Sequence, residues 1–291
     1  MIAPMPVIVG APRSGTTLLR FMLDAHPALA IPPETGFFHS LAELGDLAQC
    51  STEQFLDFIT HCPRSAPAWA DFSVSEDTLR ERLHALTPFN IADALRCFYR
   101  LYAEQHSKPR WGDKTPIHAL HIATIARVLP EARIIHIIRD GRDASLSLRP
   151  LWFAPAQDFS TLAAHWQNII RTARSQAREC PHYREIRYED LIREPAHELA
   201  ALCEYLDLPF APAMLAYHEH TSERLREHRD RSAADGTLIA TNETRRRTHE
   251  LTSRPPDVTR IGVWKKEMPR EAQGEFSTVA GELLRELGYG D

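Results

Sequence analysis

The sequence has few cysteines and no long hydrophobic run, and both shortages exclude classes of protein. Its five cysteines are an odd number in 291 residues and none stands in a CxxC spacing, which argues against a disulfide framework and a structural zinc site. No apolar stretch approaches the length of a membrane-spanning helix, and residues 6–10 already begin a strand, so we expect no signal peptide. We therefore predict a reduced, cytoplasmic protein with no membrane partner.

A large excess of charge of one sign is also missing. The chain has 34 basic and 39 acidic residues, a net charge of -5, so no global field attracts a polyanion and no nucleic-acid partner is expected. Any anion site must therefore be local. With 43% hydrophobic residues the composition is that of an ordinary globular protein, and the length is enough to bury a sizeable core. We expect a single domain over residues 1–291.

Short apolar runs alternate along the chain with longer segments of helical spacing. Runs rich in β-branched residues predict buried strands, and apolar residues three or four apart predict helices. Strands that alternate with helices indicate an α/β fold with a central parallel sheet flanked by helices. The expected strands lie at 7–9, 133–138 and 185–188, and the expected helices run from Ser14 to before Pro27 and over 161–177, 195–206 and 270–287.

Two segments interrupt this alternation. Residues 35–108 read as a helical insertion, with Ser75 as the start of one helix and a second helix at 91–102. Residues 221–260 are rich in Arg, Thr, Glu and His and poor in large apolar side chains. We interpret this second segment as a mobile surface excursion or lid on the acceptor side.

Residues 10–17 read Gly-Ala-Pro-Arg-Ser-Gly-Thr-Thr, between the first expected strand and helix. Backbone N–H groups and the helix dipole make an anion site at such a junction. A triphosphatase loop has Lys where this chain has Thr16, and here the cation lies upstream at Arg13. The exchange suits a shorter, diphosphate-like group held without a metal bridge. The alternative, a glycine turn with Ser14 as helix cap, is less favoured; the loop side of the predicted site is Arg13, Ser14, Gly15, Thr16 and Thr17.

This loop resembles the 5′-phosphosulfate loop of sulfotransferases that use 3′-phosphoadenylyl sulfate (PAPS). Residues 12–18, Pro-Arg-Ser-Gly-Thr-Thr-Leu, are most similar to the tyrosylprotein and bacterial branches, which have Arg where the cytosolic steroid and phenol enzymes have Lys. The resemblance implies a P-loop-like three-layer α/β fold with helical insertions. It also implies PAPS as co-substrate, adenosine 3′,5′-bisphosphate (PAP) as product, and no required metal.

The same resemblance implies a second phosphate site. The family binds the 3′-phosphate with an Arg directly after a core strand and a Ser eight residues further on, and Arg139 and Ser147 stand at that spacing. A cation and a hydroxyl can grip one phosphate between them. The alternatives are a surface ion pair between Arg139 and Asp140, or a triphosphatase strand with Asp140 on magnesium. The missing loop lysine and the position of Ser147 favour the sulfotransferase.

Two further segments match the family less completely. Tyr188, in Arg-Tyr-Glu-Asp-Leu, resembles a segment near the adenine pocket, where its ring contacts the base; a half-buried tyrosine at a strand end is the alternative. Residues 260–265 resemble the late Gly-x-Trp-Lys/Arg segment that covers the 3′-phosphate. The resemblance assigns cofactor contacts there to Arg260, Gly262 and Lys265.

Sulfuryl transfer needs in-line geometry, a base for the incoming nucleophile and stabilised charge on the leaving oxygen. Glu34 follows two prolines and precedes apolar residues, which we expect to raise its pKa, and family branches with the Arg-type loop use Glu here. The alternative is that Glu34 supplies first-turn charge to a helix starting at Thr35. In the cytosolic enzymes the base is the His of Lys-Thr-His, but Pro116 stands at that position. The predicted catalytic residues are thus Glu34, Lys114 and Arg13.

The acceptor is expected to be a small molecule with a hydroxyl or amine group. Five aromatic residues either line an apolar acceptor pocket or belong to the ordinary core. Residues 245–247, all Arg, either contact an anionic acceptor or form a solvated face. His118 and His121 read as surface or core-edge histidines rather than metal ligands. Alternative functions are a P-loop kinase or triphosphatase, or a non-catalytic nucleotide-binding protein. The five aromatic residues are Phe37, Phe38, Trp111, Trp152 and Phe153.

Overall fold

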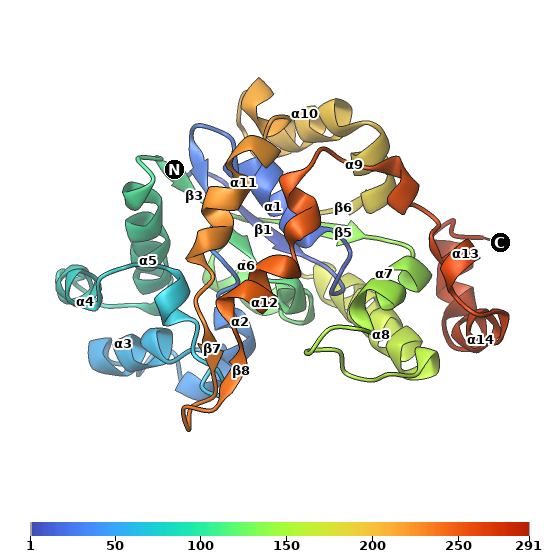
Figure 1. Cartoon of the computed structure of the whole chain (residues 1–291). Coiled ribbons are helices and arrows are strands. Elements are labelled where there is room, and N and C mark those ends of the chain that lie inside the picture. The colour runs from blue at the N-terminus through green and yellow to red at the C-terminus, as the bar shows by residue number, and fades with distance from the viewer. Residues whose placement is uncertain (1, 291) are drawn as a thin grey trace.

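Four parallel strands form the central sheet of the computed structural model, which describes residues 2–290 (Figure 1). Their order is β4-β1-β5-β6, and β1 lies between β4 and β5, with Ile8 beside both Lys114 and Ile135. Parallel strands bring their carboxyl ends to one edge, so the segments that follow each strand meet there. The bounds are β1 Met5–Val9, β4 Asp113–Lys114, β5 Ala132–Ile138 and β6 Tyr183–Arg187.

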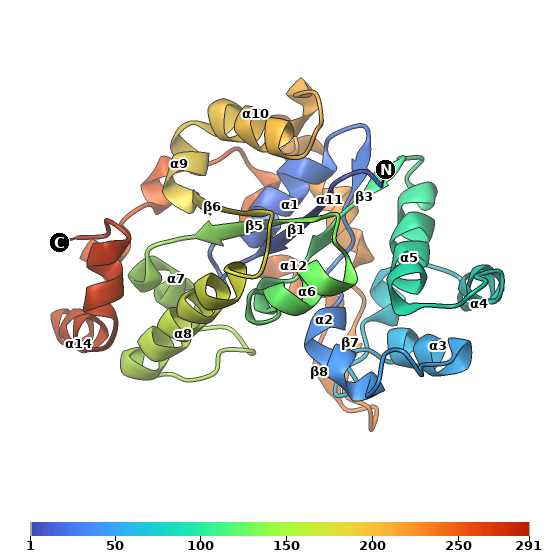
Figure 2. The same cartoon turned by 180° about the vertical axis from the view of Figure 1, so that it is seen from behind.

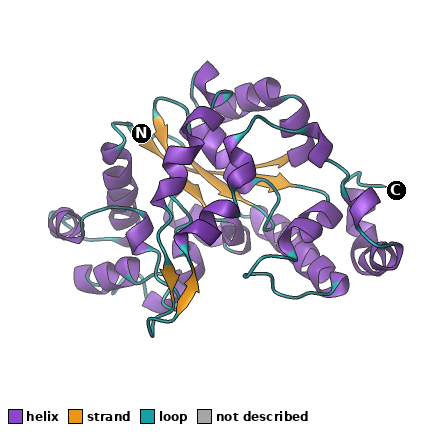
Figure 3. Cartoon of the chain, viewed as in Figure 1, coloured by secondary structure: helices purple, strands orange, loops and turns teal. Residues whose placement is uncertain are grey.

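Helices cover both faces of this sheet, as Figures 2 and 3 show. Side chains alternate along β5: Ile135 and Ile137 pack with one layer of helices, and Ile134 and Ile138 with the other. Both layers are built of helices whose apolar stripe faces the sheet. The first layer holds α1 (Thr16–Asp24), α9 (Tyr188–Arg193) and α10 (Pro195–Tyr205); the second holds α6 (Ile122–Val128), α7 (Gly141–Leu148), α8 (Phe159–Ala177) and α14 (Arg270–Glu286).

The predicted α/β fold with a central parallel sheet and flanking helices is confirmed. Strands β1, β5 and β6 and helices α8, α10 and α14 fall where the sequence pattern placed them. Strand β4 was not predicted, because an edge strand of two residues, Asp113 and Lys114, leaves no apolar run to detect.

The predicted helical insertion contains its own aromatic cluster, joined to the second layer. Phe37 packs edge-on against Phe98 and Phe72, with ring centroids 5.0 Å and 6.1 Å away. Phe37 and Phe38 are fully buried, so the hypothesis that they line an acceptor pocket is wrong. The insertion contains α2 (Phe37–Ser40), α3 (Thr52–Thr60), α4 (Glu76–His84) and α5 (Ile91–Gln105), with β2 (Leu29–Ala30) paired to β3 (Arg110–Trp111) at its base.

Residues 221–260 fold across the carboxyl edge of the sheet, and we call them the cover segment (Figure 1). Three of their arginines form ion pairs with the body of the protein: Asp71 lies 2.6 Å from both Arg231 and Arg245, and Arg224 lies 2.9 Å from Asp24. The mobility of this segment stays a prediction. Its elements are the end of α11 (His218–Arg224), β7 (Arg231–Ser232), β8 (Leu238–Ala240), α12 (Asn242–Arg247) and a 3-10 turn, η6 (Glu250–Ser253); α13 (Trp264–Glu267) follows.

Between residues 2 and 290, no helix combines the length and the apolar character needed to cross a bilayer.

Close packing at the start of α7 gives a test of the fold. A Cβ on Gly141 would lie 2.5 Å from the Trp166 ring and 2.8 Å from the Phe276 ring, so Gly141→Ala forces α7 away from α8 and α14. Overpacking of this kind costs about 2 kcal/mol, and we expect Tm to fall by about 4–8 °C in calorimetry. Gly274→Ala is the control, since its Cβ meets no atom within 4 Å and alanine favours the helix. Equal Tm values for the two variants would contradict this packing.

Candidate active site

The loop between β1 and α1 is shaped by two residues in the left-handed region, Arg13 with φ 70° and Gly15 with φ 97°. Such backbone curls successive N–H groups around a concave anion site. A Cβ on Gly15 would lie 2.5 Å from the ring of Tyr188, so only glycine lets that ring lie directly on the loop. Tyr188 follows β6 and Arg139 follows β5, and the carboxyl edge of the sheet thus brings them both to the loop.

Guanidinium groups gather around this loop. Arg13 donates from Nε to the Ser147 hydroxyl at 3.1 Å and from Nη2 to the Thr248 carbonyl at 3.2 Å. Arg139 donates to the Arg13 carbonyl at 3.2 Å and to the Arg260 carbonyl at 3.0 Å, and lies 4.4 Å from the centre of the Tyr188 ring. The structure therefore brings Arg13 together with Arg139 and Ser147, which lie more than 120 residues further along the chain.

This cluster has more positive charge than nearby carboxylates balance. Burial, and then the neighbouring Arg139, lower the pKa of Arg13 to about 10, although Glu34 acts in the opposite direction. Two buried polar atoms here, Ser14 Oγ and Arg139 Nε, have no hydrogen-bond partner among the described residues. Buried polar atoms without partners are uncommon and costly. A phosphate-like anion would supply both the missing acceptor and the missing charge, so these residues fit such a group.

Asp143 fixes the late segment against the cluster. Its carboxylate accepts from the backbone N–H of Gly262 at 2.7 Å and of Trp264 at 2.8 Å, and lies 3.8 Å from Arg139. Burial raises the pKa of Asp143. Gly262, whose φ is 73°, therefore contributes its backbone N–H to this contact. Arg260 lines the pocket. Lys265 is exposed beside the Trp264 ring and is not among the lining residues, so the structure does not bring it to the site.

Asp140 does not pair with Arg139. It accepts bonds from the Arg142 side chain at 3.0 Å and 2.9 Å and caps α7 by accepting from the Arg142 N–H. The alternative of a surface Arg139–Asp140 pair is therefore wrong. Within residues 2–290, no group of three or more His, Cys, Asp or Glu side chains is placed to hold a metal.

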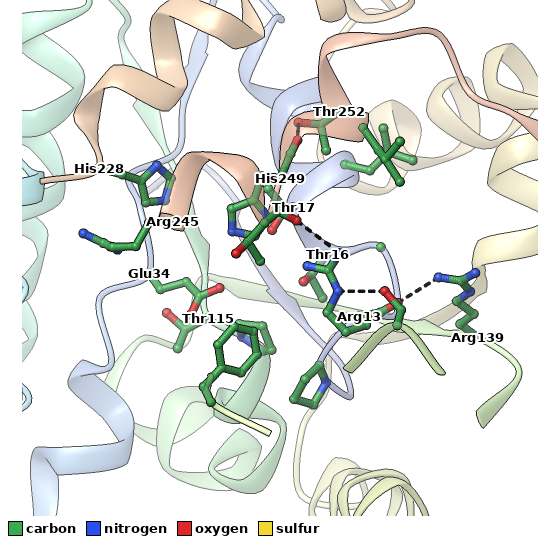
Figure 4. A pocket seen from close by; sticks show the side chains of 18 of the residues that line it. Arg13, Thr16, Thr17, Glu34, Thr115, Arg139, His228, Arg245, His249 and Thr252 are labelled. Carbon is green, nitrogen blue, oxygen red and sulfur yellow. Dashed lines mark hydrogen bonds between the residues drawn. The ribbon is translucent and has the colours of Figure 1, made fainter. Parts of the chain in front are cut away.

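Glu34 and Lys114 form an ion pair at the other end of the loop, with 2.6 Å between Oε1 and Nζ. Lys114 is buried and also donates to the Thr17 hydroxyl at 3.3 Å, whereas half of the Glu34 side chain is exposed. The pairing of β4 with β1 sets Lys114 beside the loop. Figure 4 shows Glu34 and Thr115 on one side, Arg139 on the other, and Arg13, Thr16 and Thr17 between them.

The expectation that apolar neighbours raise the pKa of Glu34 is wrong. Burial by itself raises the pKa, but the Lys114 ammonium group, helped by Arg231, outweighs burial and holds the pKa below its ordinary value. The phenylalanines that follow Glu34 in sequence turn into the core and leave its carboxylate to the cations. Burial lowers the pKa of Lys114, and Glu34 only partly opposes this.

A buried polar network holds the Glu34 loop to β4. Asp113 accepts from the Thr35 hydroxyl at 2.7 Å and from the Tyr99 hydroxyl at 2.9 Å, and its other oxygen lies 2.9 Å from His118 Nδ1. Because His118 Nε2 accepts from the Phe38 N–H, the ring proton is assigned to Nδ1. His118 is fully buried, so its interpretation as a surface or core-edge histidine is wrong. The network fixes the distance between Glu34 and Lys114.

The cover segment supplies site residues that the sequence did not reveal. His228 and His249 lie with ring centroids 5.6 Å apart, and both line the pocket (Figure 4). Burial, followed by Arg245 and Arg20, lowers the pKa of His228 to about 3. Burial and nearby cations, with Lys114 first among them, lower the pKa of His249. No sequence motif marks these two histidines, because only the folding of the cover segment brings them to the pocket and to the cations that lower their pKa values.

These elements enclose one pocket of about 490 Å³. Trp152 and Phe153 contribute to its wall, whereas Trp111 does not. Ser14 and Lys114 are not among the lining residues, but Lys114 contacts Glu34 and Thr17, which are. The predicted site residues that line the pocket are Arg13, Gly15, Thr16, Thr17, Glu34, Arg139, Ser147, Tyr188 and Arg260.

The fold and site define an α/β protein with a strand–loop–helix anion site. Residues 4–212, more than half of the chain, match the model of the sulfotransferase family, and the chain belongs to that family. A putative protein-tyrosine sulfotransferase of Caenorhabditis briggsae is 29% identical, covering 72% of this chain and 68% of that protein. Protein-tyrosine sulfotransferase 1 of Danio rerio is 24% identical, over 98% of this chain and 72% of that protein. The chain is a sulfotransferase enzyme.

Solved structures agree in fold. The sulfotransferase domain from the curacin biosynthetic pathway has a TM-score of 0.62 at 20% identity, and the match covers 97% of this chain and 98% of that domain. The sulfotransferase domain from the Synechococcus PCC 7002 olefin synthase has a TM-score of 0.57 at 21% identity, and the match covers 96% of this chain and 94% of that domain. A mouse sulfotransferase complexed with PAP has a TM-score of 0.51 at 13% identity, with 97% and 84% covered. At such identities the likeness concerns the fold alone.

The buried imidazole of His228 gives a pH-dependent test. Its pKa is near 3 in the folded protein against 6.5 ordinarily, so the unfolded chain binds the proton first as pH falls. Stability is complete above pH 6.5 and is lost from there toward pH 3, by up to about 1.4 kcal/mol per pH unit. Between pH 7 and 5, urea unfolding should show His228→Gln losing about 2 kcal/mol less than the native chain. His197→Gln, on the exposed face of α10, is the control, and equal losses for all three proteins would contradict a neutral His228.

Proposed function

We propose that this sulfotransferase uses PAPS as donor and Glu34 as general base. The observation that carries the proposal is the guanidinium cluster around a loop that has Thr16 where a triphosphatase has lysine, with Ser14 Oγ and Arg139 Nε buried and unpartnered in it. Such a site suits a ligand with two separate anionic groups and no metal bridge. The mouse sulfotransferase of the same fold was solved with PAP, which is the product of PAPS after transfer.

In this proposal the donor's two phosphate ends occupy different parts of the site. Backbone N–H groups of the loop and the hydroxyls of Thr16 and Thr17 hold the 5′-phosphosulfate at the N-terminus of α1. Arg139, supported by the segment at Arg260, holds the 3′-phosphate, and the Tyr188 ring lies beside the base. The 5′ end then points toward Glu34 and its partner Lys114; Figure 4 shows Glu34 on the side of the loop away from Arg139.

The bound donor supplies an electrophilic sulfur and a phosphate leaving group. The acceptor oxygen forms a bond to that sulfur while the bond between the sulfur and the phosphate oxygen breaks. Glu34 takes the proton of the acceptor hydroxyl, and its low pKa keeps it ionised and ready to do so at neutral pH. Lys114 and Arg13 stabilise the negative charge that collects on the leaving phosphate oxygen. Lys114 reaches both Glu34 and Thr17, so one ammonium group connects the base to the loop.

Donor choice is tested by thermal shift. PAP without magnesium should raise Tm by about 5–10 °C at a hundredfold excess over its Kd, because binding to the native state alone stabilises it. ATP with magnesium should give a smaller shift, since the loop lacks the lysine that reaches the outer phosphates. Stabilisation by ATP–magnesium but not by PAP would favour the kinase alternative and overturn the proposal.

The role of Glu34 is tested by Glu34→Gln, which keeps shape and removes the base. With labelled PAPS and an accepted hydroxyl compound, kcat should fall by about 10²–10⁴, while the Tm shift caused by PAP persists. Glu43→Gln is the control, because Glu43 is a carboxylate nearby in sequence that pairs with Arg64 outside the pocket. A Glu34→Gln protein that keeps full activity would remove Glu34 from the mechanism.

A further inference from the structure

The ring of His249 is a feature of the pocket that the proposed function leaves unused. The residue directly precedes η6 in the cover segment, and η6 packs against α1, the helix that begins at the loop. His249 lines the pocket and is not fully buried. Among residues 2–290, no group hydrogen-bonds to either of its ring nitrogens. Its neighbour His228 differs, because Nδ1 of that ring donates to the Leu225 carbonyl at 3.3 Å.

Contacts on both sides hold the backbone of His249 in place. Arg13 donates to the Thr248 carbonyl at 3.2 Å, so the loop itself binds the residue before His249. The Thr252 hydroxyl donates to the His249 carbonyl at 2.6 Å. The His228 ring packs against the His249 ring, with the two planes 32° from parallel. The imidazole is therefore fixed at the loop although its own nitrogens take no part in fixing it.

This imidazole lies at the end of the loop where transfer is proposed to occur. Burial has the largest effect on the pKa of His249, and Lys114 comes next, ahead of every other charged group. Lys114 is the partner of Glu34. Figure 4 shows His249 beside Thr17 and away from Arg139. In the proposed function the 5′-phosphosulfate occupies this end, so its sulfuryl group is the part of the donor nearest to the ring.

A neutral imidazole suits a sulfuryl group at this position. Burial and the surrounding cations keep the ring neutral, so it has one N–H to donate. In-line transfer requires the sulfur to be held on the line between the leaving and the incoming oxygen. Lys114 and Arg13 act on the leaving oxygen in the proposed function, which leaves the sulfuryl oxygens without a donor that orients them. A neutral N–H supplies this orientation without adding charge to the guanidinium cluster.

We infer that the ring N–H of His249 donates a hydrogen bond to the sulfuryl group of the bound donor and aligns that group with the incoming oxygen. This inference rests on the proposed function and adds to it a donor-binding residue from the cover segment. His249 keeps its N–H throughout, and the proton of the acceptor goes to Glu34. The cover segment thereby becomes part of the donor site, in addition to forming a wall of the pocket.

Titration calorimetry with PAPS and with PAP, in the absence of an acceptor, isolates this contact, because the two ligands differ only in the sulfuryl group. At about pH 8 they carry the same formal charge, so charge alone does not separate them. We expect His249→Ala to weaken PAPS about 3–10-fold more than PAP, which is the range for one hydrogen bond. Of His249→Asn and His249→Gln, whose amides keep an N–H, at least one should retain the native preference for PAPS.

His220→Ala is the matched control, because His220 is exposed on α11 and lies outside the pocket. It should bind both ligands as the native chain does. An equal loss of PAPS and PAP in His249→Ala would reduce His249 to a structural role and overturn the inference, and unchanged affinity for both ligands would overturn it too. In either case the donor proposal would stand. A native chain that binds neither ligand would overturn the donor proposal and this inference together.

Discussion

The crowding of buried guanidinium groups around one loop is the constraint on which the rest of the site depends. Arg13 and Arg139 lie close enough that burial and mutual repulsion depress the pKa of Arg13, and the native fold tolerates this only because other elements hold both groups in place. Asp143 holds the backbone at Gly262, Ser147 and Thr248 accept from Arg13, and Gly15 makes room for Tyr188. These contacts hold the two guanidinium groups together in spite of their repulsion, and an anion that binds between them would relieve that repulsion.

The opposite end of the loop has the reverse arrangement, in which a carboxylate is surrounded by cations. Lys114 connects the two ends, since it contacts both Glu34 and Thr17, and the network under Asp113 keeps Glu34 at that distance. The cover segment completes the enclosure with neutral imidazoles, which add hydrogen-bonding groups without further positive charge. Charge is thus arranged along one line, from an excess of cations at Arg139 to a paired carboxylate at Glu34.

Much of this could be predicted from the sequence because the anion loop and the strands are local patterns. Strand β5 and the loop before α1 have spacings that require no knowledge of distant contacts, and the family resemblance singles out Arg139 directly after that strand. The state of Glu34 could not be predicted, since it depends on Lys114 reaching it from an edge strand of two residues. His249 was missed for the same reason, because only folding of the cover segment brings it to the loop. The assignment of Lys265 rests on the resemblance alone, and on α13 this side chain is exposed.

The central claim is that the guanidinium cluster binds two phosphates of one ligand, with Arg139 on the 3′-phosphate. Isothermal titration of PAP and of adenosine 5′-monophosphate into the native chain and into Arg139→Ala tests it most directly. We expect PAP to bind the native chain about 10–100-fold more tightly than the monophosphate, and this difference to shrink to a few-fold in Arg139→Ala, because a charged hydrogen bond contributes about 1.5–3 kcal/mol. Equal affinities of the native chain for the two ligands, or an equal loss of both in Arg139→Ala, would contradict the account.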